Sequence, residues 1–260
     1  MRWGVVVAAG GLVPDPLAGA LGTPRKALAV IKGRTSLART LDAIRDAGYD
    51  NCVTVSGEDV RDEVHFGKLV TEGDSQIENV RIATEALGPA DAVLFLPADA
   101  PLLTADSLTQ FVAAVEGRRD EEQVRWFAAG LCEHKQFSAK YPGFPIHPIR
   151  LRDGAFVSGA LYAASPAGFL HAVNEIDRFA RSRKSQLAML WKLGPWAVIC
   201  YLMHRISIAD AERRVGGLMG GQAMIITGCD PCMVADIDDV ATYDEIRVIA
   251  NLTDSIAGEE

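Results

Sequence analysis

Short, unbroken apolar runs alternate in the first half of the chain with segments whose apolar residues recur at helical spacing. Three such runs, at residues 5–9, 52–55 and 92–96, are typical of strands buried in a parallel sheet. Residues 36–47 carry their leucine and isoleucine side chains on one helical face. Strands that alternate with helices predict an α/β fold of three layers, α/β/α, in which helices cover both faces of a mostly parallel, Rossmann-like sheet.

Capping residues place two more helices in this alternation. Ser75 can cap a helix that runs to about residue 87, with Glu78 at the position of a capping-box partner. Thr104 can cap the next helix, and residues 124–129 resemble a further strand. The first half of the chain therefore contains several complete strand–helix units.

The second half is less regular, and no linker divides it from the first. We expect a single domain over residues 1–260, with an acceptor-side and helical subregion at about residues 133–220. The expected elements are, in order, a loop at 140–154, a strand at 155–163, a helix from 165, helical segments over 182–216, short strands near 224 and 234, and a last helix from about 240.

Composition narrows the class of protein. Apolar residues make up 49% of the 260 residues, and the net charge of −8 comes without a block of basic residues, which argues against a nucleic-acid partner. The longest apolar run, at residues 195–203, is too short to span a bilayer. Five cysteines do not form a disulfide framework, and no secretory leader is expected, so a cytoplasmic location is the prediction.

The loop after the first strand is the first candidate site. Ala8, Ala9, Gly10 and Gly11 are small enough to bring backbone N–H groups against phosphate oxygens, although a plain turn would use the same residues. At the far end of the loop, Lys26 follows Pro-Arg and precedes Ala-Leu. A lysine there can hold its ammonium group over phosphates and offset charge that grows in a transition state.

These two motifs together resemble the MobA-like nucleotidyltransferases, relatives of the molybdenum cofactor guanylyltransferases, with the glycosyltransferase-A type fold of sugar-nucleotide pyrophosphorylases. The resemblance implies that Lys26 is catalytic and that residues 8–11 bind the nucleotide. Many family members carry an arginine inside the loop, whereas residues 12–23 contain no basic residue. Arg25, which lies between Pro24 and Lys26, is a candidate substitute for triphosphate contacts.

Two acidic segments match the family further along the chain. Asp99 lies in Asp-Ala-Pro, which resembles the family's metal-binding D-x-P segment, and residues 236–244 resemble its DxDTPEDY segment with Asp239 in place of threonine. The resemblance implies that Asp99 and Asp238, and next Asp236, bind Mg²⁺, an ion that needs few carboxylates. Capping of the following turn or helix is the competing interpretation of both segments.

Weaker similarities point to the two substrates. Gly73 and Asn79 lie in a stretch that flanks the nucleotide base in relatives, and Ser158 and Gly159 resemble the family's acceptor-side strand, where Ala160 replaces an asparagine. The basic cluster that includes Arg183 and Lys184 can bind an anionic acceptor, but it can equally be a solvated helix start.

The resemblance thus implies an Mg²⁺-dependent enzyme that joins a nucleoside monophosphate from an NTP to a phosphorylated small molecule and releases pyrophosphate. Molybdopterin, a sugar phosphate, a polyol phosphate and a lipid-precursor phosphate all remain open as acceptors. A non-catalytic nucleotide-binding homologue is the alternative from another class. The preferred NTP and a homodimer are left open, and Cys229 and Cys232 are expected to be thiols without a metal.

Overall fold

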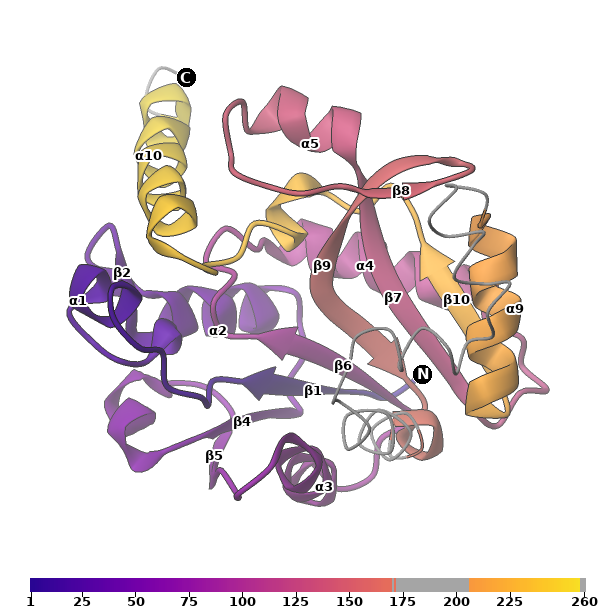
Figure 1. Ribbon diagram of the computed structural model, residues 1–260. Helices are drawn as coiled ribbons and strands as arrows, with labels where there is room; N and C mark the ends of the chain where they lie inside the picture. The colour runs from indigo at the N-terminus through magenta and orange to yellow at the C-terminus, as the bar shows by residue number, and fades with distance from the viewer. Residues whose placement is uncertain (170, 172–205, 258–260) are drawn as a thin grey trace.

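The computed structural model describes residues 1–169, 171 and 206–257, and its centre is one eight-stranded sheet (Figure 1). The strands lie in the order β10-β7-β9-β6-β1-β4-β5, and β8 pairs with β9 at the side. The strands are β1 (Trp3–Ala8), β4 (Cys52–Ser56), β5 (Lys68–Thr71), β6 (Ala92–Pro97), β7 (Trp126–Glu133), β8 (Ile149–Leu151), β9 (Gly154–Ala164) and β10 (Gln222–Ile226).

The direction of the strands brings the loops that follow β1, β4, β5 and β6 to one edge of the sheet. β5, β4, β1 and β6 pair in parallel, and so do β7 and β10. β9 lies antiparallel between β6 and β7 and interrupts this pattern. The sheet is therefore mostly parallel, as the sequence predicts, and the carboxyl ends of β1, β4, β5 and β6 meet at the same edge.

Helices cover both faces of the sheet and also extend beyond its edge. In Figure 1, α3 lies on one side of the central strands, and α2 and α4 lie on the other. The helices described are α1 (Leu17–Leu21), α2 (Ser36–Asp46), α3 (Gln76–Leu87), α4 (Ala105–Arg118), α5 (His134–Lys140), α9 (Ile208–Met219) and α10 (Val240–Ala257), with the 3₁₀-helices η1 (Lys26–Leu28), η2 (Glu58–Glu63) and η3 (Pro231–Met233) and the hairpin β2 (Val30–Ile31)–β3 (Arg34–Thr35).

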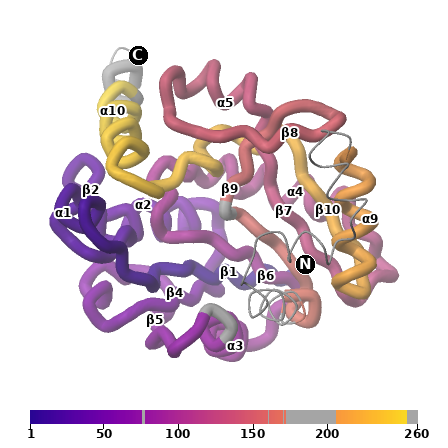
Figure 2. Tube along the Cα trace, in the orientation of Figure 1, coloured from indigo at the N-terminus to yellow at the C-terminus, as the bar shows by residue number. Residues whose placement is uncertain are grey.

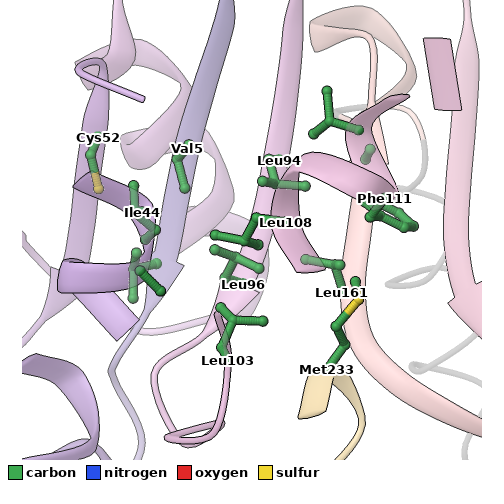
Figure 3. Packing of buried hydrophobic residues seen from close by; sticks show 14 of the residues in the cluster. Val5, Ile44, Cys52, Leu94, Leu96, Leu103, Leu108, Phe111, Leu161 and Met233 are labelled. Carbon is green, nitrogen blue, oxygen red and sulfur yellow. The ribbon is translucent and has the colours of Figure 1, made fainter. Parts of the chain in front are cut away.

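Alternate residues of the strands pack against opposite helical layers. Val5 and Leu94 lie in one buried cluster with Ile44 of α2 and Leu108 of α4, as Figure 3 shows. Val6 belongs to a separate cluster on the α3 face of the sheet. Each fully buried side chain of this size contributes about 1.5–3 kcal/mol, so the two clusters hold the three layers together.

A third buried cluster lies beside the carboxyl edge of the sheet. It joins Leu17 of α1 and Phe137 of α5 to Ile237 and to Tyr243 and Ile246, which lie in the first two turns of α10. The Tyr243 hydroxyl also donates a hydrogen bond to the backbone oxygen of Val30 in β2, at 3.2 Å. Figure 2 shows the resulting course of the chain, in which α10 returns to the region of α1 and β2.

The structure corrects two sequence predictions in the second half. A short strand was expected near residue 234, but Pro231–Met233 forms the 3₁₀-helix η3, because Pro231 begins the turn and Asp230 Oδ1 accepts the Cys232 N–H at 2.8 Å. The expected loop at 140–154 contains β8, which pairs with β9.

The described residues do not cover the whole of the second half. The basic cluster at residues 180–185, the apolar run at 195–203 and most of the helical segments expected over 182–216 lie outside the described residues. The helix α9 lies within the described part of the chain. Of the described helices, none combines the length and the apolar character that crossing a membrane requires.

Candidate functional site

Three loops meet at the carboxyl edge of the sheet through backbone hydrogen bonds. The Ala98 N–H donates to Ala8 O at 2.9 Å, which joins the ends of β6 and β1. The Ile237 N–H donates to Asp99 O at 3.0 Å and brings the C-terminal acidic segment to the same place. Segments that are more than a hundred residues apart therefore share one edge.

The side chains of Lys26, Asp99 and Asp238 converge there. Lys26, which begins η1, places its Nζ 3.0 Å from Asp99 Oδ2 and 3.1 Å from Asp238 Oδ1. The three side chains are 24%, 16% and 69% exposed, so the group lies at the mouth of the site and not in the core. Two carboxylates that reach one ammonium group can also reach one other small cation.

Burial and charge shift the acid–base properties of this group. Burial lowers the pKa of Lys26, but the Asp99 and Asp238 carboxylates outweigh it, and the pKa lies above its ordinary value. Burial raises the pKa of Asp99 by more than the Lys26 ammonium lowers it. Burial, with the charges of Asp238 and Asp99, raises the pKa of Asp236 to about 7. The site therefore holds an excess of negative charge that a divalent cation would relieve.

The acidic C-terminal segment alternates between the core and the site. Ala235 and Ile237 are fully buried, while Asp236 is partly exposed and Asp238 is exposed. This alternation puts the two carboxylates on the same side, as an extended segment requires. Thr242 fixes the segment, because its Oγ1 accepts the N–H of Asp238 at 2.9 Å and that of Asp239 at 3.0 Å.

Asp239 closes a reciprocal cap at the start of α10. Its Oδ1 accepts the Thr242 N–H at 2.8 Å, while Thr242 Oγ1 accepts from the Asp239 backbone. The capping interpretation of the acidic segment therefore holds for Asp239, whereas Asp238 points its carboxylate toward Lys26. Aspartate serves as well as threonine as an N-cap residue, which explains this departure from the family pattern.

A cavity of about 180 Å³ lies against these residues. It is lined by both ends of the first loop and by the β6 end, which puts the glycine residues and the lysine of the first motif on one wall. The lining residues are Ala8, Ala9, Gly10, Gly11, Leu12, Val13, Lys26, Ala27, Ala98 and Asp99.

Arg25 is turned away from this wall. Its side chain is 6% exposed, and its guanidinium group pairs with Asp59 at 2.8 Å and with Glu72 at 3.0 Å. The other oxygen of Glu72 accepts the Gly11 N–H at 3.2 Å. A triphosphate contact of Arg25 stays a prediction, and it would have to compete with these two ion pairs.

The base-side and acceptor-side candidates occupy other places. Asn79 Oδ1 accepts the Gly73 N–H at 2.6 Å, so these two residues shape the loop after β5. The Ser158 side chain is exposed on β9, and Gly159 packs on the Met233 carbonyl. Neither pair lines the cavity. Arg183 and Lys184 lie outside the described residues, and all these assignments stay predictions.

The carboxylates fit a hard cation such as Mg²⁺. The Oδ1 atom of Asp99 is buried and has no hydrogen-bond partner, which leaves a ligand atom available, and Asp238 reaches the same centre. Within the described ranges no cluster of three or more His, Cys, Asp or Glu side chains is arranged to hold a metal ion. Mg²⁺ commonly uses only one or two carboxylates and completes its shell with water and phosphate oxygens.

The pKa values of the described cysteines bear on their use as metal ligands. Cys132, Cys229 and Cys232 are buried free thiols, and burial raises the pKa of Cys229 and of Cys232 to about 11. Thiols that stay protonated at neutral pH bind metals poorly.

Some residues of the site were not singled out from the sequence. Glu72 and Asp59 contact Arg25 from distant loops, whereas Thr242 contacts its own segment, four residues from Asp238. Thr242 carries a readable signal, because it follows Asp239 by three residues, the spacing of a reciprocal helix cap. Asp59 carries none.

Comparison with known proteins gives a family match and several structural neighbours. The sequence profile of the MobA-like NTP transferase domain matches residues 4–163, a region that includes Lys26 and Asp99 and ends before Asp238. A comparison with curated proteins finds no match.

Solved structures share the fold over nearly the whole chain. A hypothetical transferase from Thermus thermophilus is 26% identical, with a TM-score of 0.80 over 94% of this chain and 100% of that chain. CMP:2-keto-3-deoxy-manno-octonic acid synthetase, solved with CTP, is 11% identical, with a TM-score of 0.58 over 97% and 100%. The 2-C-methyl-D-erythritol 4-phosphate cytidylyltransferase of Thermus thermophilus is 16% identical, with a TM-score of 0.54 over 96% and 100%. The last two similarities show the fold alone.

Proposed function

Since the chain belongs to the family of MobA-like NTP transferases, we propose that this nucleotidyltransferase moves a nucleoside monophosphate from an NTP to a phosphorylated small molecule. The observation that carries the proposal is the convergence of Lys26 with Asp99 and Asp238 beside the glycine loop. A solvated surface lysine would not be held by two carboxylates from distant loops. The same convergence favours catalysis over a degenerate, non-catalytic homologue.

Each part of the site has a task in this reaction. The backbone of residues 8–11 lines the cavity and would lie against the triphosphate, and Lys26 would neutralise charge near the α-phosphate. Asp99 and Asp238 would hold Mg²⁺, with Asp236 beside them. When bound, the ion supplies positive charge that offsets the charge of the triphosphate.

The chemistry is a single displacement at phosphorus. A phosphate oxygen of the acceptor forms a bond to the α-phosphorus, the bond from that phosphorus to the bridging oxygen breaks, and pyrophosphate carries away the electron pair. The protein needs no nucleophile of its own, because positioning and charge neutralisation suffice for such transfers. Lys26 keeps its proton throughout, in accord with its raised pKa.

The acceptor is proposed as a class. Molybdopterin, sugar phosphates and polyol phosphates all offer the required phosphate oxygen. The structural neighbour that is named for 2-C-methyl-D-erythritol 4-phosphate supports the polyol phosphates as one option, through a shared fold.

Two linked assays test the function. Thermal-shift measurements with ATP, CTP, GTP and UTP, with and without Mg²⁺, identify the nucleotide, because a ligand that binds only the native state raises the melting temperature. Pyrophosphate release is then measured with that NTP and a panel of phosphorylated acceptors. Turnover with one acceptor is the expected result, and a failure of all four nucleotides to bind would overturn the proposal.

Lysine variants connect the activity to the site. Lys26→Met should lower kcat by about a hundredfold or more, because it removes a charge that stabilises the transition state. Lys68→Met is the matched control, since Lys68 is exposed on β5, where its Nζ donates a hydrogen bond to the Ala86 carbonyl at 3.5 Å. Full activity of Lys26→Met would remove this residue from the mechanism.

A further inference from the structure

Arg25 is a buried cation directly before the proposed catalytic lysine. Its guanidinium Nε lies 2.8 Å from Asp59 Oδ2, and its Nη1 lies 3.0 Å from Glu72 Oε1. The residue is 5% exposed, and its ion pairs raise its pKa against the opposing effect of burial. The guanidinium group therefore stays charged and is held at the carboxyl ends of β4 and β5.

The Glu72 carboxylate links Arg25 to the glycine loop. One carboxylate oxygen is held by Arg25, and the other, Oε2, accepts the Gly11 N–H at 3.2 Å. Gly11 lines the cavity together with Lys26, the residue that follows Arg25. Arg25 is thus connected to two of the residues that line the cavity, through the backbone to Lys26 and through Glu72 to Gly11.

The ion pairs of Arg25 with Asp59 and Glu72 pack against two glycine residues, Gly10 and Gly57, at which a side chain would clash. A Cβ atom on Gly10 would lie 3.1 Å from Cδ of Glu72 and even closer to its Oε2. A Cβ atom on Gly57 would lie 2.8 Å from Nη2 of Arg25 and 2.6 Å from Asp59 Oδ1. Both ends of the ion-pair network are therefore packed onto bare backbone, which fixes the carboxylate of Glu72 in place.

We propose that Arg25 is a positioning residue, which holds Glu72 on the Gly11 N–H and so fixes the glycine loop in the form that receives the nucleotide. The proposal rests on the proposed function for its consequence in catalysis, but not for the contact itself. Arg25 then acts without touching a phosphate, because its guanidinium group already serves two carboxylates. Arg25 also neutralises the charge of Glu72, because without Arg25 the Glu72 carboxylate would lie unpaired beside an anionic substrate.

Amide hydrogen exchange tests the contact in the absence of any nucleotide. In Arg25→Met and in Glu72→Ala, the Gly11 amide should exchange about tenfold faster, which corresponds to the loss of about 1.4 kcal/mol from one hydrogen bond to a charged group. The Val5 amide, which donates to Asn51 O at 2.8 Å in the core of the sheet, serves as the internal reference for global unfolding.

A matched control separates positioning from general stability. Arg118 also holds a carboxylate, Glu212 at 2.9 Å, and a backbone oxygen, that of Ile225 at 2.7 Å, but it lies at the β10 side of the sheet. Arg118→Met should lower the melting temperature and leave Gly11 exchange unchanged relative to Val5. Arg25→Lys, which keeps a positive charge, should give a smaller change than Arg25→Met and carries the test if Arg25→Met does not fold.

Kinetics with the NTP found by the thermal-shift panel test the consequence. Arg25→Met should raise the KM for that NTP about tenfold while kcat falls less than threefold, because Lys26 and the two aspartates remain. The double variant Arg25→Met/Glu72→Ala should be no worse than the single variants, since both remove one contact.

The outcomes distinguish this proposal from the proposed function. Unchanged Gly11 exchange in Arg25→Met, or effects of Arg25→Met and Glu72→Ala on KM that simply add, would overturn the positioning of the loop by Arg25. Absence of turnover with every NTP would overturn the proposed function, while the exchange measurement would still decide whether Arg25 holds the loop.

Discussion

Replacing Asp236 by asparagine should stabilise the fold at neutral and alkaline pH but not in acid. The carboxylate lies within the field of Asp238 and Asp99 and is largely removed from water, and these effects raise its pKa from the ordinary value of 3.8 to about 7. Asparagine keeps the shape of the side chain and removes the charge. The perturbation therefore isolates the electrostatic cost of one carboxylate in the acidic site.

The magnitude follows from the linkage between protonation and stability. A pKa shift of roughly three units corresponds to about 4 kcal/mol at full ionisation, and solvent screening reduces this to about 2–4 kcal/mol. The sign follows from the raised folded-state pKa, because the folded protein binds more protons than the unfolded chain between pH 3.8 and about pH 7. The contribution of Asp236 to stability therefore falls through this range as pH rises, and Asp236→Asn removes this contribution.

Urea unfolding in the presence of EDTA, at pH 4.5 and at pH 8, measures the effect. The chelator matters because a bound divalent cation would lower the pKa of the carboxylates around it. Asp244→Asn serves as the control, since the Asp244 side chain is 63% exposed on α10 and forms a long ion pair with Arg247, at 3.9 Å. An equal gain of Asp236→Asn at both pH values, or no gain at pH 8, would refute the electrostatic reasoning.

Two further substitutions test how the acidic segment is held. Thr242→Val should lower the free energy of unfolding by about 1–2 kcal/mol and lower the rate of pyrophosphate release, because it removes the acceptor that fixes the Asp238 N–H. Thr242→Ser keeps this acceptor and should retain both the stability and the rate. Chemical denaturation and kinetics compare the two variants. Gly159→Ala should cost about 1–3 kcal/mol, since its Cβ would lie 2.6 Å from Met233 O and 2.7 Å from Val234 Cγ1, and a melting temperature equal to that of the natural protein would contradict this packing.

Local sequence patterns predicted the first half of the fold well. The apolar run at residues 5–9 lies in the centre of the sheet as β1, and the helix expected over 36–47 is α2, with Thr35 as its N-cap. Ser75 and Thr104 cap α3 and α4 as expected. The sequence predicts these elements correctly because their signals are contained in roughly ten to fifteen consecutive residues.

Long-range pairing limited the prediction of the second half. The antiparallel insertion of β9 between β6 and β7 joins residues 93–95 to residues 162–164, and no local pattern records such a choice of partner. In the first half, the edge strand β5 (Lys68–Thr71) is the exception, because it has no continuous apolar run and its sequence carries little strand signal.

The residues of the candidate site also fall into those that local motifs predict and those that depend on long-range packing. Lys26, Asp99 and Asp238 follow from motifs that resemble a known family, and the structure brings all three side chains together. The contacts of Arg25 with Asp59 and Glu72 could not be foreseen, because they depend on the start of η1 lying against the segments that follow β4 and β5. An arginine before the lysine fits a phosphate contact equally well from sequence alone.

The position of Asp238 depends on tertiary packing and not on strand order. Asp99 follows β6 directly, and parallel strands bring their carboxyl ends together by construction. Asp238 instead reaches the site because Ile237 is buried in the third cluster and donates its N–H to Asp99 O. A substitution that loosens this cluster should therefore separate the two carboxylates while the central sheet remains intact, so stability of the sheet alone does not preserve the proposed metal site.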